Sequence, residues 1–191
     1  MGKIAIFIFD NMTDYEITFI NHLLRVDGGK ETMTVSYEDK IVKSASGMSY
    51  KADRLLCDVT SDELDGLIIC GGWFGELRDE LVGLIQKLNS ENKLLAGICG
   101  AGTFFLAASG VLDNVSYTTP ITSWTQRHRA VFGEKDPFPR QNYVEKRVVS
   151  DRNVVTATGV AFVDFSVEIC DKLGLFGSYE EKRSFTALYR G

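Results

Sequence analysis

Short apolar runs alternate with segments of helical periodicity along most of the chain. Strand-length runs occur at 3–9 (KIAIFIF), 64–72 (LDGLIICGG) and 93–99 (KLLAGIC), and each is apolar at nearly every position, as in strands covered on both faces. Between these runs, apolar residues recur at helical spacing in 13–26 and 75–91. The alternation predicts an α/β fold, a three-layer sandwich with a mostly parallel sheet.

The rest of the chain supplies further elements with less regular spacing. The predicted segments are a strand at 31–37, a hairpin-like pair at 41–53, helices at 102–110, 121–130, 163–176 and 178–189, and strands at 143–149 and 153–159 with a turn at Asp151. Thr13 and Glu16 have the spacing of a capping box at the start of the first helix. No repeat, low-complexity tract or proline-rich linker divides the sequence, so residues 1–191 are predicted to form one domain.

Charge and composition argue against several classes of protein. The 45% hydrophobic and 25% charged residues are ordinary for a globular domain, and the net charge of −5 disfavours nucleic-acid and anionic-membrane partners. No apolar run approaches the roughly 20 residues of a membrane span, and the N-terminal segment lacks the pattern of a signal peptide. These features predict a cytoplasmic protein that binds neither nucleic acid nor membranes.

Cysteine and histidine usage points away from metal binding. The four cysteines are widely scattered, without a C-x-x-C pair, at Cys57, Cys70, Cys99 and Cys170. This scatter favours reduced thiols, although the even number leaves disulfides open. His22 and His128 are the only histidines, so we expect no metal site and no cofactor.

The stretch 94–105 (LLAGICGAGTFF) places Cys99 among small residues where a buried strand passes into a helix. Small neighbours allow a strained backbone at such a turn, as in the G-x-S-x-G nucleophile elbow, and the positive end of the helix dipole favours a thiolate. A buried structural cysteine is the plain alternative. A phosphate loop is a weaker one, because Gly97, Gly100 and Gly102 reverse the G-x-G-x-x-G spacing and lie in the middle of the chain.

The turn at Gly71-Gly72 is predicted to fall at the same edge of the sheet as Cys99. Its backbone N–H groups, together with that of Gly100, could stabilise an oxyanion, although such glycine pairs are also common in ordinary turns.

Two carboxylates follow the first predicted strand. A protonated Glu16 that reached Cys99 would donate a hydrogen bond to the thiolate, whereas an ionised one would raise the thiol pKa. Its default role there is to complement the helix dipole. Asp14 is a second, less supported candidate for the functional role.

A base for the thiol proton is hard to find in the sequence. A cysteine nucleophile usually has a histidine partner. His22 lies within a predicted helix, facing solvent or core, and His128 lies between two arginines on what is predicted to be a solvated charged face. This lack weakens a prediction of hydrolysis but leaves a reactive thiol possible.

These residues together resemble the DJ-1/PfpI superfamily, relatives of the class I glutamine amidotransferase domain. The resemblance rests on Glu16, on Gly71-Gly72 after LII and on AGICGAGTFFLAASGVLDN, and SYTTP and YVEKRVVSDRNVVTATG extend it over nearly the whole chain. It implies a flavodoxin-like sandwich and a homodimer. It also implies that Cys99 is the elbow nucleophile, that protonated Glu16 is its hydrogen-bond partner and that the amides of Gly72 and Gly100 form the oxyanion hole.

Two departures from that family pattern argue against protease activity. Peptidase-type members carry a histidine directly after the cysteine, where this chain has Gly100. Members closer to DJ-1 have a histidine before the VEK segment, where DPFPRQNY has none. The leading hypothesis is a cysteine-dependent hydrolase or lyase for a small carbonyl or amide-like substrate. A redox sensor that works through Cys99 oxidation and a binding module without catalysis are the alternatives, and the expected partner is a small-molecule substrate or oxidant.

Overall fold

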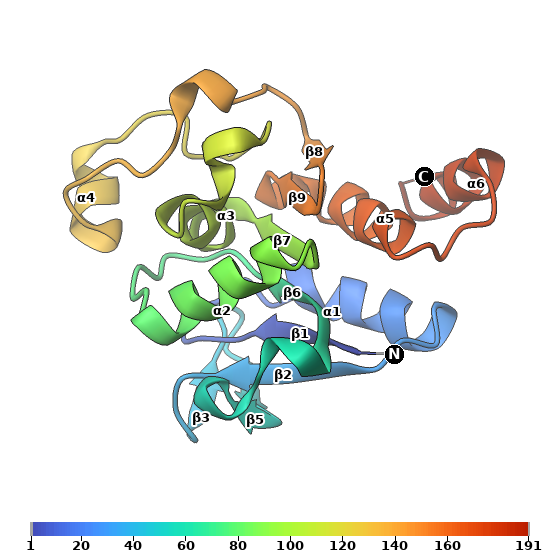
Figure 1. Ribbon diagram of the computed structural model, residues 1–191, viewed down its shortest axis with the longest axis horizontal. Coiled ribbons are helices and arrows are strands. Elements are labelled where there is room, and N and C mark those ends of the chain that lie inside the picture. Colours follow the sequence, from blue (N-terminus) through green and yellow to red (C-terminus); the bar gives the residue numbers. More distant parts are fainter. Residues whose placement is uncertain (1, 191) are drawn as a thin grey trace.

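A seven-stranded sheet runs through the middle of the computed structural model, which describes residues 2–190. Its strand order is β5-β2-β1-β6-β7-β9-β8 (Figure 1). The strands are β1 (Lys3–Phe7), β2 (Thr32–Ser36), β5 (Arg54–Leu55), β6 (Leu64–Ile69), β7 (Leu94–Ile98), β8 (Val148–Asp151) and β9 (Val154–Ala157). All neighbouring strands are parallel except β8 and β9, which confirms the predicted mostly parallel sheet.

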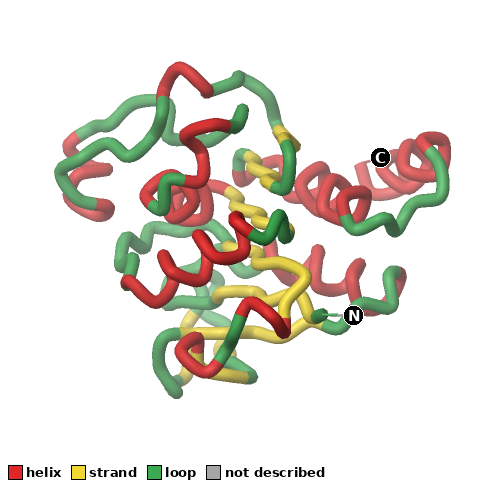
Figure 2. Tube along the Cα trace, in the orientation of Figure 1, coloured by secondary structure: helices red, strands yellow, loops and turns green. Residues whose placement is uncertain are grey.

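Helices cover both faces of this sheet (Figures 1 and 2). One face carries α1 and α5, which pack against each other, with α6 packed on α5; the other carries α2 and α3. Their bounds are α1 (Tyr15–His22), α2 (Asp79–Ser90), α3 (Cys99–Ala108), α5 (Phe162–Lys172) and α6 (Tyr179–Arg190). A π-helical turn at Leu23–Asp27 extends α1. This is the three-layer sandwich that the hydrophobic pattern predicted.

The central strands form the core because they are apolar on both faces. All five residues of β7 are buried, as are all but one of the six in β6. Helix α2 buries one stripe, Leu81, Leu84, Ile85 and Leu88, at the spacing of a single helix face. Each such side chain, when fully buried, contributes about 1.5–3 kcal/mol to folding. The carboxyl ends of β6 and β7 are therefore anchored in the buried core.

Several predicted boundaries differ from those in the structure. The helix predicted over 75–91 begins at Asp79, because Arg78 has an extended backbone and its N–H donates to the Tyr37 hydroxyl at 3.1 Å. The strand predicted at 143–149 begins only at Val148, because Val144 pairs instead with the carbonyl of Tyr117.

A predicted helix cap and a predicted turn also differ from the structure. The predicted capping box of Thr13 and Glu16 does not form: Asp14 is the N-cap residue without a side-chain cap, and the Glu16 carboxylate points inward instead. The turn between β8 and β9 lies at Arg152 and Asn153, one residue after the predicted position, with Arg152 in a left-handed conformation.

Two smaller elements flank the carboxyl edge of the sheet. The hairpin of β3 (Ile41–Lys43) and β4 (Ser49–Lys51) is a separate antiparallel pair. It is tied to the loop after β1 through the buried carboxylate of Asp14, which accepts hydrogen bonds from the hydroxyls of Ser44, Ser46 and Tyr50 at 2.9, 2.6 and 2.9 Å.

Helix α4 (Gln126–Phe132) lies beside the loop that follows β6. A Cβ on Gly75 of that loop would collide with the Val131 carbonyl of α4, so only glycine permits this approach. The residue after Gly72, Trp73, stacks on His128 of α4. The β6 turn is therefore held from outside by α4.

Candidate active site

Cys99 sits where β7 passes directly into α3, with φ of 60°. This left-handed backbone is unfavourable for a residue with a side chain, by about 1–3 kcal/mol, and persists only where the surroundings enforce it. The strand and helix approach so closely at this turn that a Cβ on Gly97 would lie 2.5 Å from the Gly102 carbonyl oxygen. The small residues thus allow the abrupt turn, and the turn projects the thiol from the end of the strand.

The carboxyl ends of β1 and β6 bring the other predicted residues to Cys99. The Gly71 carbonyl accepts the N–H of Thr13 at 2.9 Å, and its N–H donates to Oε2 of Glu16 at 2.6 Å. Gly72 has φ of 139°, a conformation that requires glycine, and its carbonyl accepts the N–H of Ala101 in the first turn of α3. The three strand ends predicted to converge are therefore hydrogen-bonded to one another.

Glu16 is fully buried beside the thiol. Burial raises the pKa of its carboxyl to about 7, and the Gly71 N–H partly opposes that shift. Among the described residues, Oε1 of Glu16 has no hydrogen-bond partner. It faces the same space as Cys99 Sγ, because a Cβ on Gly159 would lie 2.9 Å from each of the two atoms.

The pKa of the Cys99 thiol is also raised. Burial, and next the negative charge of Glu16, raise its pKa to about 11, while hydrogen bonding by the N–H groups of Gly100 and Gly72 acts in the opposite direction. Burial therefore outweighs the helix dipole that favoured a thiolate. Between about pH 7 and pH 11 the pair of Glu16 and Cys99 holds one proton, which either group can carry.

Gly159 is a site residue that the sequence analysis missed. It follows β9, the neighbour of β7, and walls the thiol on the side opposite Gly71. A Cβ on Gly71 would lie 3.1 Å from Sγ and 2.6 Å from Glu16 Oε2. The sequence could have identified Gly159, because it lies two residues after the end of β9 and the strand-end rule that selected Gly71 applies to it as well. Gly71 and Gly159 thus bound the space beside the sulfur, which we call the slot.

Neither histidine contacts the pair of Glu16 and Cys99. His22 is exposed at the end of α1. Arg127 and Arg129 are exposed, as predicted for a solvated face. The ring of His128 departs from that prediction: it is half-buried and stacks on Trp73 at 5.8 Å and on Trp124 at 5.7 Å. Its Nδ1 accepts the backbone N–H of Thr125 at 3.1 Å.

Asp14, the second carboxylate considered, has a structural role. Its hydrogen bonds to Ser44, Ser46 and Tyr50 turn it toward the β3–β4 hairpin. These bonds more than offset burial and lower its pKa. It therefore fixes the loop that leads into α1, and through it the start of the helix that carries Glu16.

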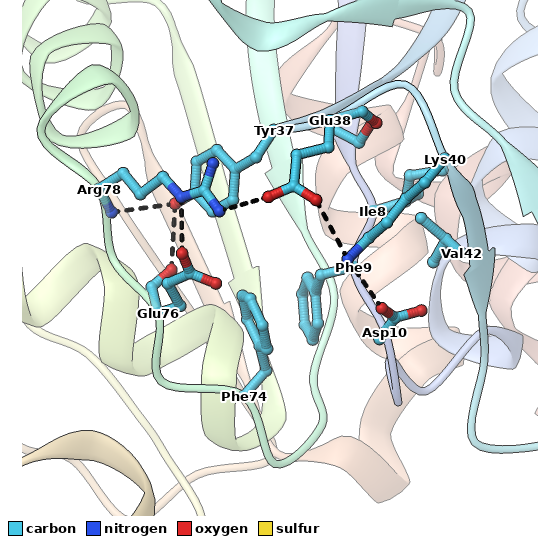
Figure 3. A pocket seen from close by; sticks show the side chains of 11 residues that line it. Ile8, Phe9, Asp10, Tyr37, Glu38, Lys40, Val42, Phe74, Glu76 and Arg78 are labelled. Carbon is cyan, nitrogen blue, oxygen red and sulfur yellow. Dashed lines mark hydrogen bonds and ion pairs between the residues drawn. The ribbon is translucent and has the colours of Figure 1, made fainter.

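A small hollow lies next to this edge, behind the stacked rings of Phe9 and Phe74 (Figure 3). Its volume of about 30 Å³ suits little more than a water molecule. Charged side chains cross its mouth as a chain of ion pairs, in the order Asp10, Lys40, Glu38, Arg78 and Glu76. Since each is paired with its neighbour, these ion pairs brace the three loops that follow β1, β2 and β6 rather than offering free charge to a ligand.

Three further features of residues 2–190 concern metal ligands, helix length and the state of the cysteines. Within residues 2–190, no group of three or more His, Cys, Asp or Glu side chains is arranged to hold a metal ion. No helix in that range is long and apolar enough to cross a bilayer. All four cysteines are free thiols.

Comparison with known proteins agrees with this geometry. The protein named Uncharacterized protease YoaZ, from Bacillus subtilis, is 26% identical over 190 residues, covering 91% of this chain and 84% of its own length. Deglycase PfpI from Pyrococcus furiosus is 31% identical over 122 residues, covering 62% of this chain and 72% of its own length. The solved structure of the DJ-1 superfamily protein Atu0886 from Agrobacterium tumefaciens superposes with a TM-score of 0.80 at 31% identity, covering 99% of this chain and 100% of that one. The family model described as the DJ-1/PfpI family matches residues 2–172, and the chain belongs to that family.

Proposed function

We propose that this protein is a cysteine-dependent enzyme in which Cys99 attacks the carbonyl carbon of a small substrate. The observation that carries the proposal is the strained backbone of Cys99, which projects its thiol between two glycines and against a buried carboxyl group. Structural cysteines have no need of such a conformation, and strain of this kind clusters at active sites.

The chemistry follows from the neighbours of the sulfur. As Sγ forms a bond to the carbonyl carbon, its proton passes to Glu16, whose pKa of about 7 makes it a suitable acceptor near neutral pH. The π electrons of the carbonyl move to its oxygen, and the N–H groups of Gly72 and Gly100 stabilise the resulting charge. Glu16 then returns the proton to that oxygen, which yields a neutral hemithioacetal when the substrate is an aldehyde.

Substrate size is limited by the walls of the slot. Gly71 and Gly159 approach the sulfur from opposite sides, so a flat, sp² carbon with a small substituent fits better than a branched one. Among the relatives, one is named a protease and another a deglycase. Peptide hydrolysis further needs protonation of an amine leaving group and activation of water. Glu16 alone would have to do both here, which favours a small carbonyl compound over a peptide.

Turnover of glyoxal and methylglyoxal tests this function. We expect wild-type protein to consume them and Cys99→Ser to lose at least about 100-fold in rate, since removal of a nucleophile abolishes covalent catalysis. Cys57→Ser is the matched control, because Cys57 is exposed and lies outside the site. Turnover by Cys99→Ser at the wild-type rate would end the covalent proposal.

Oxidation of Cys99 is the second candidate function, and the unpartnered Oε1 of Glu16 favours it. Peroxide would convert the thiol to a sulfenic acid with release of water, and a second peroxide would convert that to a sulfinic acid. When Glu16 is protonated, its unpartnered Oε1 would donate a hydrogen bond to a sulfinate oxygen. Peroxide titration followed by intact-mass measurement should show the gain of two oxygen atoms, located at Cys99 by peptide mapping. Oxidation of Cys57 ahead of Cys99 would count against a sensor.

A further inference from the structure

Two buried threonine hydroxyls connect the Cys99 turn to a separate segment of the chain. Thr103 lies one helical turn after Cys99 in α3. It donates from Oγ1 to the Cys99 carbonyl at 2.5 Å, and its Oγ1 lies 2.8 Å from Oγ1 of Thr119. Thr119 Oγ1 also accepts the backbone N–H of Ile121 at 3.1 Å. Both threonines are almost completely buried, with 0% and 1% exposure, so water cannot replace their partners.

The direction of these hydrogen bonds follows from the number of available protons. Each hydroxyl has a single proton, and a carbonyl has none. Thr103 gives its proton to the first turn of α3, to the Cys99 carbonyl or, at 3.3 Å, to that of Gly100. It must therefore accept from Thr119, whose own proton is not used when Thr119 accepts the Ile121 N–H. The chain of donors runs from Ile121 through Thr119 and Thr103 to the Cys99 carbonyl.

That carbonyl belongs to the same peptide unit as the N–H of Gly100. A peptide unit is planar and trans, so the direction of its C=O fixes the opposite direction of its N–H. The Gly100 N–H is one of the two groups whose hydrogen bonding favours a thiolate at Cys99. Whatever holds the Cys99 carbonyl therefore also aims the Gly100 N–H.

We propose that Thr119 and Thr103 are positioning residues that hold the Cys99–Gly100 peptide, and so keep the Gly100 N–H directed at the sulfur and at the oxyanion that forms next to it. This inference rests on the proposed role of Cys99. It assigns a function to the segment around Thr119, which contributes no other group to the site. Ile121 of the same segment also lies near the elbow, since a Cβ on Gly100 would be 4.0 Å from its Cδ1.

The neighbouring residue Thr118 provides a matched control. It is equally buried, and its hydroxyl donates to the Lys146 carbonyl at 2.7 Å rather than toward the elbow. Thr118→Val and Thr119→Val thus remove one buried hydroxyl each from adjacent positions. A merely structural role predicts that both variants lose similar thermal stability and that neither changes the chemistry of Cys99.

The test is the pH profile of iodoacetamide alkylation at Cys99, followed by peptide mapping in the full-length protein. We expect Thr119→Val to move the profile upward by about one pH unit, which slows alkylation about tenfold at a fixed pH below it. Thr119→Ser should restore the wild-type profile, and Thr118→Val should not change it. If Thr119→Val does not fold, Thr119→Ala compared with Thr119→Ser decides in the same way.

Identical profiles for wild type, Thr118→Val and the Thr119 variant that lacks the hydroxyl would overturn the inference. Loss of the proposed function is a separate result: it would appear as equal methylglyoxal turnover by wild type and Cys99→Ser, whatever the alkylation profiles show.

Discussion

Two cysteines directly follow the neighbouring parallel strands β6 and β7, and the structure treats them differently. Cys70 is completely buried, and its thiol lies 3.7 Å from the Phe7 carbonyl, which accepts its hydrogen bond. Cys99 is partly exposed, has a left-handed backbone and faces Glu16. Burial raises the pKa of both thiols. The comparison teaches that backbone conformation, rather than residue type or position at a strand end, separates the two thiols: the left-handed turn accompanies the one that is partly exposed beside Glu16.

The largest expected contrast is the rate at which the two thiols react in the native protein. Iodoacetamide should alkylate Cys99 about a thousandfold faster than Cys70, because Cys70 becomes accessible only when the core opens. Peptide mapping over time measures both sites in one sample. In denaturant the two rates should converge, and a native ratio near one would show that the backbone at Cys99 does not present its thiol.

Closing the slot above Cys99 should make this thiol behave more like Cys70. In Gly159→Ala the new Cβ would lie 2.9 Å from both Sγ and Glu16 Oε1, so one of these groups must move. Displacement of reacting groups on this scale lowers turnover by about 50-fold. Gly83→Ala is the matched control, because a Cβ there meets no atom within 4 Å and helix α2 gains about 1 kcal/mol of stability. Equal methylglyoxal turnover by the two variants would contradict the assignment of Gly159 as a wall of the site.

Glu16, the buried carboxyl group beside Cys99, should give the protein a measurable pH dependence of stability. Its folded pKa of about 7 lies above its ordinary value of 4.5, so folding favours the protonated carboxyl, and that stabilisation is lost as the pH rises toward 7. Glu16→Gln should remove this dependence. The unfolding free energy of the variant relative to wild type should therefore rise by roughly 2–3 kcal/mol as the pH increases from 5 to 8. Urea unfolding at the two pH values measures it. A constant difference between the proteins would mean that Glu16 does not titrate in this range.

The smallest expected effect comes from the hairpin tether, which lies outside both cysteine environments. Ser46→Ala removes one of three hydroxyl donors to Asp14 and should cost about 1 kcal/mol in unfolding free energy. Methylglyoxal turnover should change less than twofold, because the other two donors still hold Asp14. A turnover loss as large as that of Gly159→Ala would show that the tether, and not the slot, controls Cys99.

The fold was predictable because its signal repeats along the chain. Buried strands at 3–9, 64–72 and 93–99 read as continuous apolar runs, and the helices between them show one apolar stripe each. The parallel sheet, and the meeting of strand ends at one edge, follow from that alternation. The element boundaries were less accurate where tertiary contacts take over, as where Val144 pairs with Tyr117.

The site was predictable only where its residues stand in sequence next to a strand end. Cys99, Glu16 and the glycine pair were predicted in this way, and the structure places them side by side. The hydrogen bond between Thr103 and Thr119 joins residues 16 positions apart. No sequence pattern distinguishes a threonine with a buried donor hydroxyl from an ordinary strand threonine. His128 was misplaced for a similar reason, since the two tryptophans that enclose it come from different segments.

Substrate protection tests the central claim most directly, because it asks whether the thiol that reacts is the thiol that turns over substrate. Increasing methylglyoxal should slow iodoacetamide alkylation of Cys99 in wild-type protein, with half-protection at the concentration that gives half-maximal turnover. Alkylation of Cys57 in the same samples controls for reaction of methylglyoxal with thiols in general. Turnover that saturates while the alkylation rate of Cys99 stays constant would contradict the account.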